Sequence, residues 1–217
     1  MKIKVNEIFS SIDGEGLTTG ALATFVRLTG CNLRCSYCDT AYAFNDGSEM
    51  GIDDIIKMCH KLGNRHITLT GGEPLFQENS MELIERLIDE GFHVNLETNG
   101  SISVPSDITQ GLTITMDWKT PTSGMHRYMN EENLYHLGAN DCLKIVCSED
   151  DFEYVKNLLT THKPRCYVYL SPIFEKCDAR NLVNFLKELH NDGLDTEKYR
   201  VQIQLHKVIW DPQKRGV

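Results

Sequence analysis

Short apolar runs alternate along the chain with segments whose apolar residues recur at helical spacing. Seven of the runs predict β-strands, at residues 24–28, 66–70, 93–97, 113–117, 143–147, 166–170 and 201–205. Four segments place apolar residues three and four positions apart and predict helices, at residues 52–62, 81–88, 152–159 and 182–189. Gly91 follows the second of these helices and is a favourable residue for ending it.

Strands that alternate with helices predict a parallel sheet with right-handed crossovers. We therefore expect an α/β fold, an incomplete parallel (β/α) barrel of about six strands, formed by one domain over residues 1–217. In such folds the chemistry lies at the carboxyl ends of the strands. Polar residues at these ends are the candidates for a functional site.

Composition restricts the partners and the compartment. The net charge of −9, from 22 basic and 31 acidic side chains, argues against non-specific nucleic-acid binding. The amino-terminal segment lacks the apolar core of a signal peptide, and no apolar run of 18 residues occurs, so we expect a cytoplasmic protein with no membrane partner. In that compartment the eight cysteines stay free thiols, which serve in the core, in redox chemistry or in metal binding.

Three cysteines form a compact motif directly after the first predicted strand. Cys31, Cys35 and Cys38 have the spacing C-x3-C-x2-C, and polar residues separate them. Iron–sulfur electron carriers use four cysteines to close a cluster. Three thiolates leave one iron open to a further ligand, so the motif predicts a [4Fe-4S] cluster with a chemical role.

A structural zinc site is the alternative. It needs a fourth Cys or His nearby, commonly in a second pair. Cys59 and His60 lie about twenty residues further on, inside a helical pattern and without paired spacing. Cys142 and Cys147 border a β-run and are interpreted as strand residues.

The cysteine spacing resembles that of the radical S-adenosylmethionine (SAM) superfamily. Six further segments together resemble the 7-carboxy-7-deazaguanine synthase family over nearly the whole chain: IFSSIDGEG, TFVRLTGCNLRCSYCDT, TGGEP, LETNG, DWK and QLHKVIWDPQKRGV. The resemblance implies a lyase of the queuosine and 7-deazapurine pathway, which converts 6-carboxy-5,6,7,8-tetrahydropterin to 7-carboxy-7-deazaguanine with loss of ammonia. It also implies SAM and Mg2+ beside the cluster, flavodoxin or ferredoxin as electron donor, and a homodimer.

The resemblance places SAM at several strand ends. Glu73, in Gly71-Gly72-Glu73-Pro74, is the candidate for the SAM amino group, because two glycines let a ligand approach closely. The other candidates at this end of the sheet are Gly72, Glu97, Asn99, Asp117, Lys119 and Ser171. The alternatives are an ordinary β–α turn at Gly71-Gly72 and a surface ion pair between Asp117 and Lys119.

The substrate and the metal ion have their own candidates. Thr40 follows the last motif cysteine, and its hydroxyl suits Mg2+. In the resembled family Glu15 binds the amino-pyrimidinone edge and Arg27 the carboxylate, which a guanidinium grips with two bonds; a buried salt bridge is the alternative for Arg27. The remaining substrate candidates are Ile12, Asp13, Thr70, His206 at the end of the last strand, and Val217 at the carboxyl terminus.

One residue departs from the resembled pattern. The family carries Gln immediately before Gly-Glu-Gly, where this chain has Asp13. An ionised Asp only accepts hydrogen bonds and cannot replace a Gln amide as donor.

Two other functions share parts of the sequence signal. A small glycyl-radical activating enzyme would have the same cysteine motif but needs a groove for a protein. A non-enzymatic iron–sulfur or zinc carrier would need neither the GGEP segment nor substrate ligands at strand ends. Glu15, Arg27 and His206 favour a pocket for a small anion over both.

Overall fold

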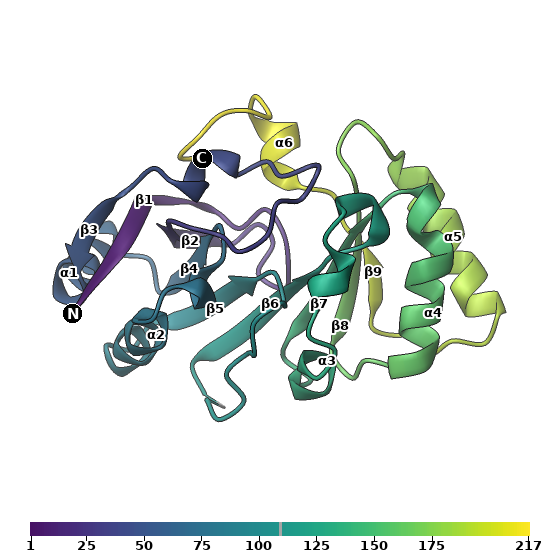
Figure 1. Ribbon diagram of the computed structural model, residues 1–217, viewed down its shortest axis with the longest axis horizontal. Helices are drawn as coiled ribbons and strands as arrows, with labels where there is room; N and C mark the ends of the chain where they lie inside the picture. Colours follow the sequence, from purple (N-terminus) through teal and green to yellow (C-terminus); the bar gives the residue numbers. More distant parts are fainter. Residues whose placement is uncertain (109) are drawn as a thin grey trace.

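The computed structural model describes residues 1–108 and 110–217 of the chain, in which nine strands form one sheet (Figure 1). The strands are β1 (Lys2–Ile12), β2 (Leu22–Leu28), β3 (Ser48–Gly51), β4 (His66–Gly71), β5 (His93–Thr98), β6 (Leu112–Trp118), β7 (Cys142–Cys147), β8 (Tyr167–Pro172) and β9 (Tyr199–Val201). The α-helices are α1 (Ile52–Leu62), α2 (Ser80–Asp89), α3 (Asn133–His136), α4 (Phe152–His162), α5 (Ala179–Asn191) and α6 (Leu205–Ile209). Short 3-10 helices are η1 (Ala41–Phe44), η2 (Pro74–Phe76), η3 (Pro121–Ser123), η4 (His126–Tyr128) and η5 (Glu149–Asp151).

The sheet is parallel from β2 onward and stays open. Its order is β3-β1-β2-β4-β5-β6-β7-β8-β9, and β2 and β4 to β9 pair in parallel. β1 pairs antiparallel with β2, and β3 antiparallel with β1. Because β3 and β9 end the strand order without pairing to each other, the barrel is incomplete, which confirms the predicted α/β fold class.

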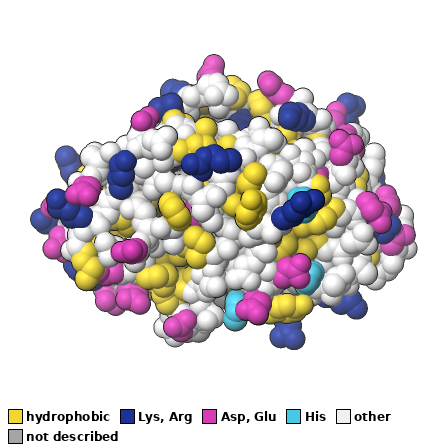
Figure 2. Space-filling model, in the orientation of Figure 1, with side chains coloured by type: hydrophobic (Ala, Val, Ile, Leu, Met, Phe, Trp, Pro, Cys, Tyr) yellow, Lys and Arg dark blue, Asp and Glu magenta, His cyan; other side chains and the backbone are white. Residues whose placement is uncertain are grey.

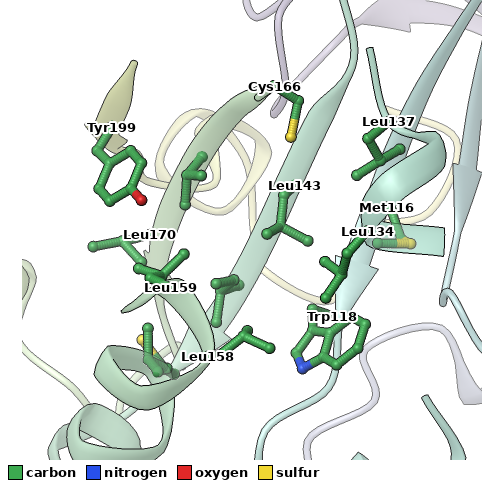
Figure 3. Packing of buried hydrophobic residues seen from close by; sticks show 14 of the residues in the cluster. Met116, Trp118, Leu134, Leu137, Leu143, Leu158, Leu159, Cys166, Leu170 and Tyr199 are labelled. Atoms are coloured by element: carbon green, nitrogen blue, oxygen red, sulfur yellow. The ribbon is translucent and has the colours of Figure 1, made fainter. Parts of the chain in front are cut away.

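The helices cover the outer face of the sheet and bury its apolar side chains there. One core cluster lies under α1 and α2 and includes Leu28, Leu69 and Leu96, each with no exposed surface. The other joins α4 and α5 to β6, β7 and β8, with Trp118 1% exposed at its edge (Figure 3). The strands thus pack outward on helices, while their carboxyl ends stay available for a site.

Two parts of the strand prediction were wrong. β1 and β3 were not predicted, and together they extend the sheet beyond β2 by antiparallel pairing. The last strand was predicted over 201–205 but ends at Val201, and His206 lies on α6 instead of at a strand end. Gln202 explains the exit from the sheet, because its side chain bonds Gly16 and Thr19 of the β1–β2 loop.

Acidic and basic side chains are intermixed on the face shown in Figure 2. Among the described helices, none is both long and apolar enough to span a membrane.

Candidate active site

A cavity of about 740 Å³ lies at the carboxyl ends of the parallel strands. Fifteen of the predicted site residues line it: Ile12, Glu15, Arg27, Cys31, Cys35, Cys38, Thr40, Thr70, Gly72, Glu97, Asn99, Asp117, Lys119, His206 and Val217. Asp13, Glu73 and Ser171 are not among its lining residues. The tertiary structure therefore brings the amino-terminal loop, the cysteine loop and the carboxyl-terminal tail to one place.

The three motif cysteines are half-buried free thiols that face this cavity. The Sγ of Cys31 accepts hydrogen bonds from the Leu33 N–H (3.4 Å) and from Nδ2 of Asn99 (3.8 Å). Burial raises the pKa of the Cys31 and Cys35 thiols, so these groups lose their protons most readily when a metal cation binds them.

The donor set fits an iron–sulfur cluster better than a single zinc ion. Within residues 1–108 and 110–217, no three His, Cys, Asp or Glu side chains are placed to hold one metal ion. A zinc site needs its ligands within about 2.3 Å of one point. A cluster instead binds each thiolate at a different iron, so its ligands lie further apart.

Gly72 allows the GGEP segment to pack directly on the cysteine loop. A Cβ on Gly72 would lie 2.2 Å from the Gly30 oxygen and 2.6 Å from the Cys31 Cβ. The Glu73 N–H donates to the same Gly30 oxygen at 2.8 Å. Glycine is needed here because the backbone at residue 72 lies closer to the cysteine loop than a side chain at this position would permit.

Glu73 holds strand ends together and lies beneath the cavity. Its carboxylate is fully buried and accepts bonds from the Thr98 hydroxyl (2.8 Å), the Asn99 N–H (2.6 Å) and the Leu75 N–H (3.0 Å). In this arrangement Glu73 positions Asn99, whose side chain also bonds Asn32 of the cysteine loop. The contact of the Glu73 carboxylate with the SAM amino group stays a prediction.

A chain of four charged side chains crosses the cavity floor. Nζ of Lys144 lies 2.9 Å from Oε2 of Glu15 and 3.1 Å from Oδ2 of Asp117, and Nζ of Lys119 lies 3.1 Å from Oδ1 of Asp117. Burial by itself would raise the pKa of Asp117, but the two lysines lower it below its ordinary value. Asp117 and Lys119 thus belong to a partly buried network of four charges, not to the surface ion pair that was the alternative.

Sequence reasoning missed Lys144. It lies in β7, in which every residue is buried. A lysine inside an otherwise apolar strand was the available signal, because a buried ammonium needs carboxylate partners.

Glu97 carries a perturbed carboxyl group at the end of β5. Burial raises its pKa to about 7; Lys144 opposes this effect and the nearby Glu15 carboxylate reinforces it. The Thr70 hydroxyl bonds Glu97 and favours its ionised form. A carboxyl group with this pKa can hold or release a proton near neutral pH.

Arg27 forms the salt bridge that was the alternative for it and also lines the cavity. Its Nε donates to Oε1 of Glu7 at 2.8 Å, which is the partly buried salt bridge named as the alternative. Tyr42 donates to the same Glu7 oxygen. Arg27 nevertheless lines the cavity, and in the described part of the chain its two Nη atoms form no hydrogen bond. They are free to bind a carboxylate.

Asp13 and Ser171 lie away from the cavity lining. Asp13 is 1% exposed and accepts bonds from the hydroxyls of Thr18 and Thr68, both at 2.6 Å, so it fastens the β1–β2 loop to β4. Ser171 has no exposed surface, and its hydroxyl has no hydrogen-bond partner among the described residues. Their contacts with substrate and SAM stay predictions.

Residues 212–217 of the carboxyl-terminal tail line the cavity. Lys207 of α6 pairs with Asp39 at 2.9 Å, beside Thr40, whose hydroxyl donates to the other Asp39 oxygen. Arg215 lies over the Tyr42 ring, 3.9 Å from its centroid. Burial lowers the pKa of His206, which favours a neutral imidazole in the cavity.

His206 lies against the glycine of the Gly-Glu-Gly segment. A Cβ on Gly14 would lie 2.9 Å from Nδ1 of His206, and the Leu205 N–H donates to the Gly14 oxygen. The opening and closing segments of the chain are thereby fixed together.

An open parallel barrel with three free thiols at its carboxyl end defines a radical SAM enzyme. The Radical SAM superfamily model matches residues 25–130. The crystal structure of SuiB from Streptococcus suis bound to precursor peptide SuiA shares the fold, with a TM-score of 0.61 over 80% of this chain and 47% of that chain, at 12% identity.

More similar relatives narrow the class to one family. The 7-carboxy-7-deazaguanine synthase of Clostridium acetobutylicum is 37% identical over 100% of both chains. That of Methanospirillum hungatei is 35% identical over 97% of this chain and 86% of the relative. The crystal structure of QueE from Escherichia coli has a TM-score of 0.75 and 25% identity, covering 94% of each chain. This chain belongs to the 7-carboxy-7-deazaguanine synthase family.

Proposed function

We propose that this enzyme contracts the ring of 6-carboxy-5,6,7,8-tetrahydropterin to give 7-carboxy-7-deazaguanine, with loss of ammonia. The observation that carries the proposal is one shared cavity, which holds the three thiols together with Glu15 and Arg27. Membership of the family supports the same reaction.

The charges of the cavity suit an anionic substrate. Seven basic side chains (Arg27, Lys119, Lys144, Lys176, Lys207, Lys214 and Arg215) and four acidic ones (Glu15, Asp39, Glu97 and Asp117) line it, in a chain whose net charge is −9. A local excess of positive charge attracts and holds a carboxylate. The free Nη atoms of Arg27 are the groups we assign to that carboxylate.

The protein holds and orients the cofactors and the substrate, and the cofactors supply the radical chemistry. Cys31, Cys35 and Cys38 hold the [4Fe-4S] cluster, and Gly72, Asn99, Asp117 and Lys119 are the residues we assign to SAM. When bound, the cluster and SAM supply the one-electron chemistry that removes hydrogen from a substrate carbon. Glu15 orients the amino-pyrimidinone edge, and the tail excludes water.

Thr40 is the proposed Mg2+ ligand. It lines the cavity beside Asp39, and both side chains offer oxygen atoms of the kind that Mg2+ prefers.

Three further assignments belong to this proposal. A flavodoxin or ferredoxin supplies the electron, because the cluster must be reduced before each turnover. The enzyme acts as a homodimer, as the resemblance implies. It works in the cytoplasm, where the eight thiols, all free in the structure, stay reduced.

Anaerobic turnover with SAM, dithionite and the carboxypterin, followed by mass spectrometry, tests the function. We expect 7-carboxy-7-deazaguanine, methionine and 5'-deoxyadenosine, and no product with the Cys31→Ala protein. SAM cleavage without the deazapurine would indicate another radical SAM reaction. Bound iron without any SAM cleavage would indicate the carrier function.

A further inference from the structure

The ammonium group of Lys144 pairs with two carboxylates that line the cavity, those of Glu15 and Asp117. Nζ lies 2.9 Å from Oε2 of Glu15 and 3.1 Å from Oδ2 of Asp117, and the Lys144 side chain is only 10% exposed. Burial by itself would lower the pKa of Lys144, but Asp117, Glu15 and Glu97 raise it well above its ordinary value. The residue is therefore a permanent cation held between carboxylates.

The two oxygens of Glu15 have different surroundings. Oε2 accepts hydrogen bonds from Lys144 and from Nε2 of Gln204 (3.3 Å). Oε1 is buried and has no hydrogen-bond partner among the described residues, although Glu15 lines the cavity. A buried acceptor without a donor is costly, and a ligand that supplies an N–H removes this cost.

Lys144 is the charged partner that holds the Glu15 carboxylate in place. Gln204 donates one neutral hydrogen bond to the carboxylate and adds no charge. The Lys144 ammonium makes a charge-assisted hydrogen bond to Oε2 and so fixes the orientation of the carboxylate, which leaves Oε1 without a protein donor among the described residues. The free oxygen is then an acceptor only, which rejects a ligand that presents another acceptor.

We propose that Lys144 is a positioning residue that fixes Glu15 as an acceptor-only contact and thereby selects ligands with an N–H donor edge. This inference rests on the proposed function, in which that edge is the exocyclic amine of a pterin. Lys144 acts through Glu15 and needs no contact of its own with the ligand.

Binding affinities measured by calorimetry on the cluster-loaded protein test whether the site selects a ligand with an N–H donor edge. The two probes are 6-carboxypterin and 6-carboxylumazine, which has a carbonyl oxygen in place of the exocyclic amine. We expect the wild-type protein to prefer the pterin by about a hundredfold or more, because a site built for a donor rejects its replacement by an acceptor. Lys144→Met should reduce this preference by about tenfold, mainly by weakening pterin binding.

Lys156→Met is the matched control. Lys156 also bridges two carboxylates, Glu188 and Asp192, but it does so between α4 and α5, outside the cavity. This variant should keep the wild-type preference. If Lys144→Met prefers the pterin over the lumazine as strongly as the wild-type protein does, the inference is overturned and the proposed function still stands. If the wild-type protein binds neither pteridine, both fail.

A second comparison covers the case in which Lys144→Met does not fold. The double variant Lys144→Met/Glu15→Gln removes one positive and one negative charge, so the buried network stays balanced. If Lys144 acts through Glu15, the double variant and Glu15→Gln alone should have the same preference between the two probes. A further loss of preference in the double variant would show that Lys144 acts independently of Glu15.

Discussion

Nζ of Lys207 lies 2.9 Å from Oδ2 of Asp39, and this contact ties the carboxyl-terminal helix α6 to the loop that carries the three cysteines. The Lys207 side chain is 9% exposed and also lies over the Phe174 ring, 5.1 Å from its centroid. The contact holds the tail against the cavity. It thereby keeps His206 and Val217, the proposed substrate contacts, near the loop that carries Thr40, the proposed Mg2+ ligand.

Lys207→Met should loosen the tail without removing the cluster. We expect the Michaelis constant for the carboxypterin to rise by about tenfold, because one charge-assisted hydrogen bond that closes the site is lost. Substrate-free SAM cleavage should be nearly unchanged. Lys2→Met, which breaks the exposed Lys2–Glu49 pair, is the control and should change neither quantity. A normal Michaelis constant in Lys207→Met would show that the pair does not close the cavity.

The cluster assignment predicts that the three motif cysteines are needed to bind the cluster and that the other cysteines are not. Replacement of Cys31, Cys35 or Cys38 by Ala should abolish the visible absorbance of the anaerobically reconstituted protein, because a three-ligand cluster cannot lose a ligand and persist. Cys59→Ala removes a fully buried thiol of α1, so it should keep the absorbance and cost about 1 kcal/mol of stability. Absorbance retained by a motif variant would contradict the assignment.

Gly72→Ala should displace the cysteine loop. The added Cβ would meet the Gly30 oxygen and Cys31 at distances shorter than atoms tolerate, so we expect a loss of about 3 kcal/mol or more and poor cluster incorporation. Gly138→Ala is the control, because its Cβ would lie 3.5 Å from the nearest atom, a carboxylate oxygen of Asp141. Thermal unfolding and the iron content per chain measure both effects. Equal behaviour of the two variants would argue against close packing at Gly72.

Glu97 should make the protein less stable as the pH rises. Its folded pKa of about 7 lies above its ordinary value of 4.5, so the folded state binds the proton more tightly than the unfolded chain. The stabilisation is complete below pH 4.5 and is lost as the pH rises towards 7. The loss amounts to about 3–4 kcal/mol, at about 1.4 kcal/mol per pKa unit.

The difference in unfolding free energy between wild type and Glu97→Gln isolates this effect. Other titrating groups contribute equally to both proteins, so the difference should fall between pH 4.5 and 7. A difference that does not change with pH would show that Glu97 ionises normally.

Arg27→Gln should weaken substrate binding and spare SAM cleavage. The loss of two free Nη donors should raise the dissociation constant of the carboxypterin by about 10- to 100-fold, the range expected for a charged hydrogen bond. Arg86→Gln, which breaks the exposed Arg86–Asp53 pair, is the matched control. Equal loss of pterin binding and SAM cleavage in Arg27→Gln would indicate a folding role, acting through the Glu7 salt bridge.

The sequence by itself determined the elements with strong local patterns. Helices α1, α2, α4 and α5 follow from the spacing of their apolar residues, and the candidate cluster cysteines follow from their short spacing in the chain. These features depend on neighbours within a few residues, so periodicity and motif spacing are enough to find them. β3 is a short strand that pairs antiparallel with β1 more than forty residues away, so it leaves no local signal. β1 was missed although apolar and polar residues alternate over residues 2–5, which is a local signal for a strand.

Only the tertiary structure decided which polar side chains face the cavity. Lys144 and Glu15 stand 129 positions apart in sequence, and Lys207 and Asp39 are even further apart. The pairing of these residues depends on how the strands and the tail pack. The same packing turned the carboxylates of Asp13 and Glu73 inward, onto hydroxyl and N–H donors of neighbouring strands. A residue type shows what chemistry is available, but the direction of a side chain is fixed by long-range contacts.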